Sequence, residues 1–242
     1  MRIVSLVPSF TKTLFDFGLD ESQIVGRTKF CIHPLDLVRN VPIVGGTKNI
    51  NLDKIRSLQP DLILASKEEN LKEPIEILMK EFRVYLTDIK KFDESQSFLL
   101  ELGQLLGKNQ IANEILHKIN RALHAPKNLV LKPVTYLIWK DPYLTVGGDT
   151  FINSILKKLG FESSYTNYDR YPEISLKELS ESQTVFLSSE PYPFKEAHKQ
   201  ELLEQFPHLE IHLVDGEAFS WYGSHLKEFT SYYEKIRKIT SA

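Results

Sequence analysis

The chain has 242 residues, a length that suits one large domain or two lobes of roughly 100 residues each. Hydrophobic residues make up 42% and charged residues 26% of the sequence, and 30 basic side chains are balanced by 32 acidic ones. This is the composition of an ordinary globular protein; it excludes disordered, collagen-like and coiled-coil classes, and it offers no basic excess for nucleic-acid binding.

Strand-like and helical segments alternate in the first part of the chain. Short apolar runs predict strands over residues 3–7, 62–65 and 84–87, and helical spacing of apolar residues predicts helices over 11–17 and 71–82. This βα alternation predicts an α/β fold.

The next segment, from Asp93 to about His124, contains no proline, and its apolar residues recur every three or four positions. This pattern predicts one long helix of roughly 45 Å. Gly103 and Gly107 lie one turn apart within it and leave a flat strip that another backbone can approach.

The second part of the chain returns to the βα alternation. Its pattern predicts strands over 134–139, 184–188 and 211–214, with helices over 151–159, 195–206 and from about Leu226 onward.

The two parts also resemble each other. Asn51 and Ser175, which are 124 residues apart, are both suited to cap a short helix, and each such helix precedes an apolar run, an acidic turn and a further helix. Chance similarity between α/β units is one explanation. The other is two related lobes joined by the long helix, with one sheet before Phe92, a separate sheet after Pro133, and a cleft between the lobes.

Ligands of α/β proteins collect beyond the carboxyl ends of the strands, and the segments expected there are rich in aromatic residues. Such rings either close the core or contact a flat, largely apolar ligand. Trp221 and Tyr222 favour the second interpretation, because Asp215-Gly216 before them and Gly223-Ser224 after them mark a loop. We therefore expect both rings to contact ligand rather than to pack in the core.

No motif for catalysis or for a structural metal is present in the sequence. Cys31 and His33 are two ligands at most, and no Cys-x-x-Cys or His-Glu-x-x-His pattern completes a tetrahedral site. A single axial bond from His33 to the metal of a tetrapyrrole stays open. No serine or cysteine lies in a nucleophile motif. We expect no metal site and no enzymatic activity.

No stretch of 18 apolar residues predicts a transmembrane helix, and the first residues lack the apolar stretch and cleavage site of a signal peptide. The sequence as written predicts a cytoplasmic protein. A periplasmic location is the alternative, if Met1 stands in place of a removed signal peptide.

Four segments carry a resemblance to a known family: residues 2–9, 44–52, 59–63 and 147–155. They resemble the helical-backbone (class III) substrate-binding proteins of ABC importers for cobalamin, ferric siderophores and haem, and residues 27–34 resemble the cobalamin branch most. The resemblance implies two related Rossmann-like lobes, residues 1–91 and 126–242, joined by a linking helix over 92–125, with the ligand in a cleft between the lobes. It also implies no intrinsic cofactor, with cobalamin, haem or a ferric siderophore as the bound ligand.

Members of this family that dock on an ABC permease carry a glutamate on each lobe that meets permease arginines, and the matching positions are Glu73 and Glu196. The expected ligand contacts are rings and basic or imidazole side chains, namely Lys29, Phe30, His33, Trp139, Tyr143, Arg170, Trp221 and Tyr222.

Two other classes of function stay open from the sequence. An intracellular enzyme or metabolite-handling protein would use the same cleft, with Glu68, Glu69, Asp141 and Asp215 as acid/base candidates. A pure interaction module would expose Glu73 and Glu196 to a partner and keep the cleft closed.

Overall fold

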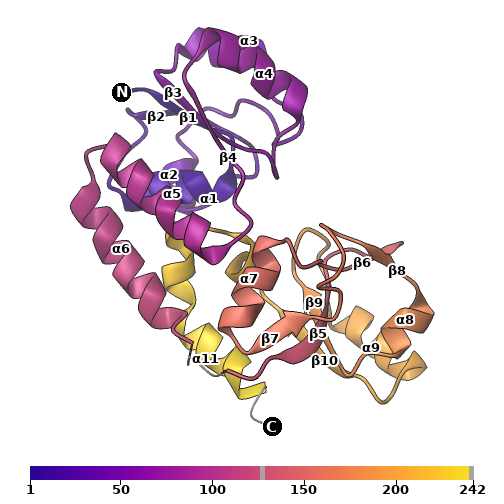
Figure 1. The fold of residues 1–242 in the computed structure, drawn as a ribbon. Coiled ribbons are helices and arrows are strands. Elements are labelled where there is room, and N and C mark those ends of the chain that lie inside the picture. Colours follow the sequence, from indigo (N-terminus) through magenta and orange to yellow (C-terminus); the bar gives the residue numbers. More distant parts are fainter. Residues whose placement is uncertain (126–128, 240–242) are drawn as a thin grey trace. The chain divides into compact units, whose positions relative to one another are not determined.

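The computed structural model describes residues 1–125 and 129–239, which form two compact units (Figure 1). Unit 1 comprises Met1–Ile89, Glu94–Leu116 and Tyr222–His225. Unit 2 comprises Lys90–Asp93, His117–Trp221 and the chain from Leu226 on. Within the described ranges, every helix is too short or too polar to cross a bilayer.

Unit 1 contains a parallel sheet in the order β2-β1-β3-β4. Its strands are β1 (Ile3–Ser5), β2 (Ile24–Arg27), β3 (Leu62–Ser66) and β4 (Val84–Thr87), and its helices include α1 (Pro8–Asp16), α2 (Leu35–Val38), α3 (Leu52–Leu58) and α4 (Lys72–Glu81). The strands β1 and β3 are fully buried, as expected for central parallel strands between helices. The strands predicted over 3–7, 62–65 and 84–87 and the helices predicted over 11–17 and 71–82 are confirmed.

Unit 2 contains a second parallel sheet in the order β10-β9-β5-β7. Its strands are β5 (Lys132–Leu137), β7 (Phe161–Ser163), β9 (Thr184–Ser188) and β10 (Glu210–Val214); its helices are α7 (Phe151–Lys158), α8 (Leu176–Ser180), α9 (Glu196–Gln205), α10 (Glu217–Ser220) and α11 (Thr230–Ile239), with a 3₁₀ turn η1 (Ser224–Phe229) before α11. A short antiparallel pair, β6 (Tyr143–Leu144) and β8 (Glu173–Ile174), lies outside this sheet. The prediction of two separate sheets is confirmed.

The internal repeat is visible in both units. Each sheet places its strands in the same order, with β1, β2, β3 and β4 equivalent to β5, β7, β9 and β10. The two predicted caps are confirmed: Asn51 accepts a hydrogen bond from the Lys54 amide, and Ser175 accepts one from the Glu178 amide within a capping box. Figure 1 shows α3 beside α4 and α8 beside α9, and each pair shares a hydrophobic cluster with its sheet.

The prediction of one long helix over 92–125 is wrong. The structure has two helices there, α5 (Phe92–Leu105) and α6 (Asn109–Ala122), because Gly107 adopts a left-handed φ of 67° and ends α5. The Gly107 amide donates to the Gln104 carbonyl and the Lys108 amide donates to the Gly103 carbonyl, which is the Schellman arrangement that closes a helix. The predicted start of the second lobe, Pro126, lies outside the described residues, and the division into 1–91, 92–125 and 126–242 stays a prediction.

The flat strip predicted around the two glycines packs, at Gly103, against a neighbouring helix of unit 1. A Cβ atom built on Gly103 would lie 2.5 Å from the Cβ of Ala112 on α6. The backbone of α5 therefore approaches α6 closely at this glycine.

Candidate functional site

The loop that follows β2, residues 28–33, is held by a buried arginine, Arg27. The Arg27 guanidinium donates through Nε to the Val38 carbonyl at 2.8 Å and through Nη1 to the Thr28 and Cys31 carbonyls, both at 3.2 Å. The Cys31 side chain lies fully buried between Thr11 and Thr28, and burial raises the pKa of its thiol. Cys31 thus anchors the loop and offers no reactive thiolate.

Two predicted ligand contacts lie on the outer side of this loop. Phe30 is 49% exposed, and the Lys29 ammonium lies 5.0 Å from the centroid of its ring, over the face. The ring also lies close to Gly46, where an added Cβ would come within 3.4 Å of it. Lys29 and Phe30 therefore form one exposed cation and ring surface at the carboxyl edge of the sheet.

His33, at the end of the same loop, is half-buried, and its ring stacks on that of His225 with 5.5 Å between centroids. The described residues contain no group of three or more His, Cys, Asp and Glu side chains arranged to hold a metal ion.

The loop after β3 carries two of the acid/base candidates, Glu68 and Glu69. Asn70 shapes this loop, because its side chain accepts from the Ser66 amide and donates to the Leu6 and Thr47 carbonyls. Burial raises the pKa of the Glu69 carboxyl, and the Lys48 ammonium partly opposes that rise.

Tyr222 is placed in the core of unit 1, contrary to the expectation that it contacts ligand instead of packing. The residue is 4% exposed, and its ring packs edge-on against Phe10 and Phe98. Its hydroxyl donates to Ser66 Oγ at 2.8 Å. The physical reason is that the segment Tyr222–His225 belongs to unit 1. The Gly223 amide donates a hydrogen bond to Ser95 on α5, and the Ser224 amide donates one to Thr13 on α1.

Unit 2 presents a second aromatic group, after β5. Trp139 is 40% exposed and meets the ring of Tyr192 edge-on at 5.8 Å. Lys140 next to it is ion-paired with Glu201 on α9 at 2.5 Å, which fastens this loop to the helix. Tyr143 follows in β6 and is half-buried, and burial raises the pKa of its phenol. Tyr192 was not among the predicted contacts, although its place after β9 is a signal that could have found it.

The loop after β7 carries Arg170, which is exposed. Tyr165 and Tyr168 on this loop lie 5.8 Å apart between ring centroids, and Tyr168 is 54% exposed. Sequence reasoning missed both tyrosines because this short strand was not predicted.

Trp221, at the end of α10 in unit 2, is 9% exposed and therefore offers little ring surface. The remaining acid/base candidates are also in unit 2. Asp141 is exposed, while the half-buried Asp215 accepts from the Glu217 amide, and its own amide donates to the Tyr232 hydroxyl.

Glu73 and Glu196 occupy equivalent places in the repeat, each exposed in the first turn of a helix, α4 and α9 respectively. Glu196 accepts a hydrogen bond from Gln200 at 2.8 Å. Glu73 lies on a groove of about 690 Å³ that also includes Ile50, Asp53 and Ile77.

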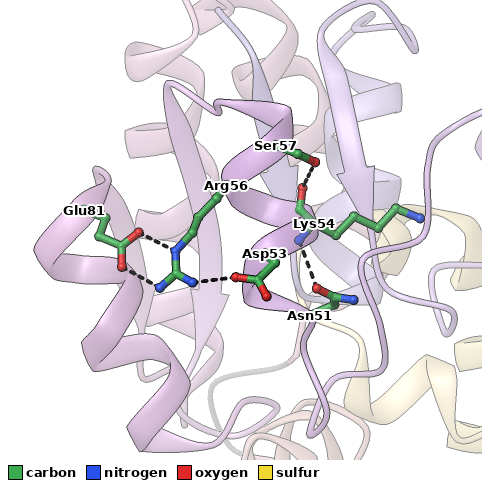
Figure 2. Close-up of polar contacts among 6 residues, drawn as sticks. All are labelled: Asn51, Asp53, Lys54, Arg56, Ser57 and Glu81. Carbon is green, nitrogen blue, oxygen red and sulfur yellow. Dashed lines mark hydrogen bonds and ion pairs between the residues drawn. The ribbon is translucent and has the colours of Figure 1, made fainter.

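Arg56 on α3 is ion-paired with a carboxylate of α4, the helix that carries Glu73, and so fastens the two helices together. Figure 2 shows Arg56 between Glu81 and Asp53. Its Nε and Nη2 donate to Glu81 at 2.8 and 2.7 Å, and Nη1 donates to Asp53 at 2.8 Å. The bidentate pair holds the two helices in register at the surface.

A sequence model described as periplasmic binding protein matches residues 3–205. The chain belongs to the periplasmic binding protein family. The vitamin B12-binding protein of Vibrio vulnificus (strain YJ016) is 26% identical over 195 residues, which are 77% of this chain and 71% of that protein.

Two solved structures share the two-lobed fold. The periplasmic vitamin B12 binding protein of Vibrio cholerae matches with a TM-score of 0.80 and 18% identity, covering 99% of this chain and 97% of the other. The periplasmic haem binding protein of Vibrio cholerae matches with a TM-score of 0.75 and 20% identity, covering 100% and 99%. The resemblance to substrate-binding proteins of ABC importers is confirmed, and members of the family are binding proteins rather than enzymes.

Proposed function

We propose that the protein is a binding protein without catalytic activity that captures a metal chelate of the cobalamin, haem or ferric siderophore type for an ABC importer. The family match over residues 3–205 carries this proposal. Relatives that bind vitamin B12 or haem support the ligand class. The placement of the ligand in a cleft between the two lobes stays a prediction.

The proposed contacts are the side chains that each unit exposes at the carboxyl edge of its sheet. Phe30 in unit 1 and Trp139 in unit 2 supply exposed rings, which suit a large, flat and mainly apolar ligand. Lys29 and Arg170 supply exposed cations for its acidic groups. His33, Tyr143 and Trp221 remain as further proposed contacts, and Tyr222 is withdrawn because its ring belongs to the core.

Freshly purified protein tests the ligand class. We expect a visible absorption spectrum from co-purified chelate, or quenching of tryptophan fluorescence on titration with cyanocobalamin, haem or a ferric siderophore. Saturable binding of one of these, with the ligand recovered chemically unchanged, supports the proposal. Conversion of a ligand would favour the enzyme alternative, and binding of none of them would overturn the proposal.

The proposal includes docking of Glu73 and Glu196 on arginines of a permease, supported by their exposure at equivalent positions of the repeat. The paired variant Glu73→Arg with Glu196→Arg should abolish stimulation of permease ATPase activity and leave chelate affinity unchanged. Glu76→Arg with Glu204→Arg, exposed on the same two helices, is the matched control. Equal loss in both pairs would contradict specific docking.

A location outside the cytoplasm is also proposed, supported by the description of the family as periplasmic. The cytoplasmic location that the first residues predict stays the alternative. Fractionation of native cells decides between the two, because periplasmic or membrane-associated recovery supports the proposal and cytosolic recovery contradicts it.

A further inference from the structure

Asp149 in unit 2 contacts Lys90 and Arg170 with different oxygens. Its Oδ2 is 3.0 Å from Lys90 Nζ, and its Oδ1 accepts a hydrogen bond from the Arg170 backbone amide at 2.6 Å. These contacts, together with the positive charges of both side chains, lower the pKa of the Asp149 carboxyl. Asp149 is therefore ionised at neutral pH.

The Arg170 backbone needs such support. Arg170 has a left-handed φ of 57°, a conformation that favours glycine and that other residues adopt only when their surroundings hold them. Its carbonyl accepts from the Gly147 amide at 2.7 Å, so Asp149 and Gly147 hold the same residue from both sides.

The segment that carries Asp149 is itself fixed against the Arg170 loop. A Cβ on Gly147 would lie 2.1 Å from the Tyr168 carbonyl oxygen, and one on Gly148 would lie 2.1 Å from the Thr166 carbonyl oxygen. Only glycines allow this close contact. Thr150 then caps α7, so Asp149 is held between a rigid turn and a helix start.

We propose that Asp149 is a positioning residue that sets Arg170 and Lys90 as a cationic pair for an acidic group, a carboxylate or a phosphate, on the bound chelate. This inference rests on the proposed function, in which Arg170 is a ligand contact. The Asp149 carboxylate fixes the backbone of Arg170 by accepting its amide. The negative charge of Asp149 also balances both cations while no acidic group is bound, so Asp149 competes with the acidic group of the ligand.

Two variants separate the role of Asp149 in fixing the Arg170 backbone from its role in balancing the two cations. Asp149→Asn keeps one oxygen to accept from the Arg170 amide and removes the charge, while Asp149→Ala removes both. Relative to the parent, we expect Asp149→Asn to bind an acidic chelate roughly threefold or more tightly and Asp149→Ala to bind it about tenfold more weakly. Opposite directions in the two variants are the signature of a positioning residue. Equal affinity in both would overturn it.

Paired ligands identify the acidic group. Haem is compared with its dimethyl ester, which lacks free carboxylates, and cyanocobalamin with dicyanocobinamide, which lacks the phosphodiester. The parent should prefer the acidic member of one pair by about tenfold, and Arg170→Ala or Lys90→Gln should reduce that preference. A parent that binds both members of each pair equally would overturn the assignment of an acidic ligand group.

A measurement without ligand tests Asp149 independently of the proposed function. Amide hydrogen exchange of Arg170, followed by NMR, should be slow in the parent and in Asp149→Asn, and at least tenfold faster in Asp149→Ala. Fast exchange in the parent would refute the positioning role. Slow exchange in the parent with no chelate binding would refute the proposed function alone.

Discussion

The Tyr222 hydroxyl donates a hydrogen bond to Ser66 Oγ at 2.8 Å and so joins two residues of unit 1 that are 156 positions apart in the sequence. Ser66 ends strand β3, and the bond reaches it from a four-residue segment that comes from the far end of the chain. Burial raises the pKa of this phenol far above its usual range, so the hydroxyl stays protonated as a donor.

Tyr222→Phe should lower the free energy of unfolding by about 1 kcal/mol, because it removes the buried hydrogen bond to Ser66 and keeps the ring. Tyr222→Ala should cost about 3–5 kcal/mol, because it also leaves a cavity beside Phe10 and Phe98. Urea denaturation measures both. If Tyr222→Ala kept the stability of the parent, the core assignment of this ring would be wrong.

Trp139→Ala should behave in the opposite way. Trp139 is 40% exposed and its ring makes an edge contact with Tyr192, so the loss of the ring should cost only about 1 kcal/mol of stability. Affinity for the chelate should fall at least tenfold if the ring is an anchor. Tyr192→Phe, which retains the edge contact, is a matched control. Undiminished affinity of Trp139→Ala would remove this residue from the proposed site.

Gly103→Ala should destabilise unit 1 by about 1–3 kcal/mol, because the new methyl group would meet Ala112 at 2.5 Å. The double variant Gly103→Ala with Ala112→Gly should recover most of this loss. Gly107→Ala meets no atom within 4 Å but is strained by its φ of 67°, so Ala112→Gly should not rescue it. Thermal unfolding of these variants tests whether the loss of stability comes from close packing rather than from helix propensity.

Glu69→Gln should stabilise the protein at pH 7 and have little effect near pH 4. Burial raises the pKa of this carboxyl in the folded state above its usual value of 4.5, so between the two pKa values the folded protein holds a proton that the unfolded chain has released. The ionised side chain therefore destabilises the fold above the folded-state pKa, and the penalty disappears as the pH falls to the unfolded-state pKa. Melting temperatures of parent and variant at both pH values are the measurement, and a variant that melts lower than the parent at pH 7 would contradict the sign.

Much of each unit follows from local sequence. The strands over 84–87 and 184–188 and the caps Asn51 and Ser175 depend on nearest neighbours: apolar β-branched or aromatic runs, and a side chain that accepts from an amide three residues on. The repeat could be recognised because the same local choices occur twice.

Other features depend on contacts between distant residues. The apolar periodicity continues through Gly107, so it could not reveal the helix end that a left-handed residue and two hydrogen bonds produce. Likewise, Tyr222 lies between loop-forming residues, and only its distant partners Ser66, Phe10 and Phe98 make it a core side chain.

The buried Arg27 guanidinium recognises carbonyl oxygens of Val38, Thr28 and Cys31, which are the same in every amino acid. This support of the loop after β2 therefore does not depend on the side chains that its exposed positions carry. Substitutions at the exposed positions Lys29, Phe30 and Ile32 should leave these hydrogen bonds of Arg27 in place. In the proposed function, this makes the loop a frame on which ligand selectivity can be redesigned while the hydrogen bonds beneath it stay intact.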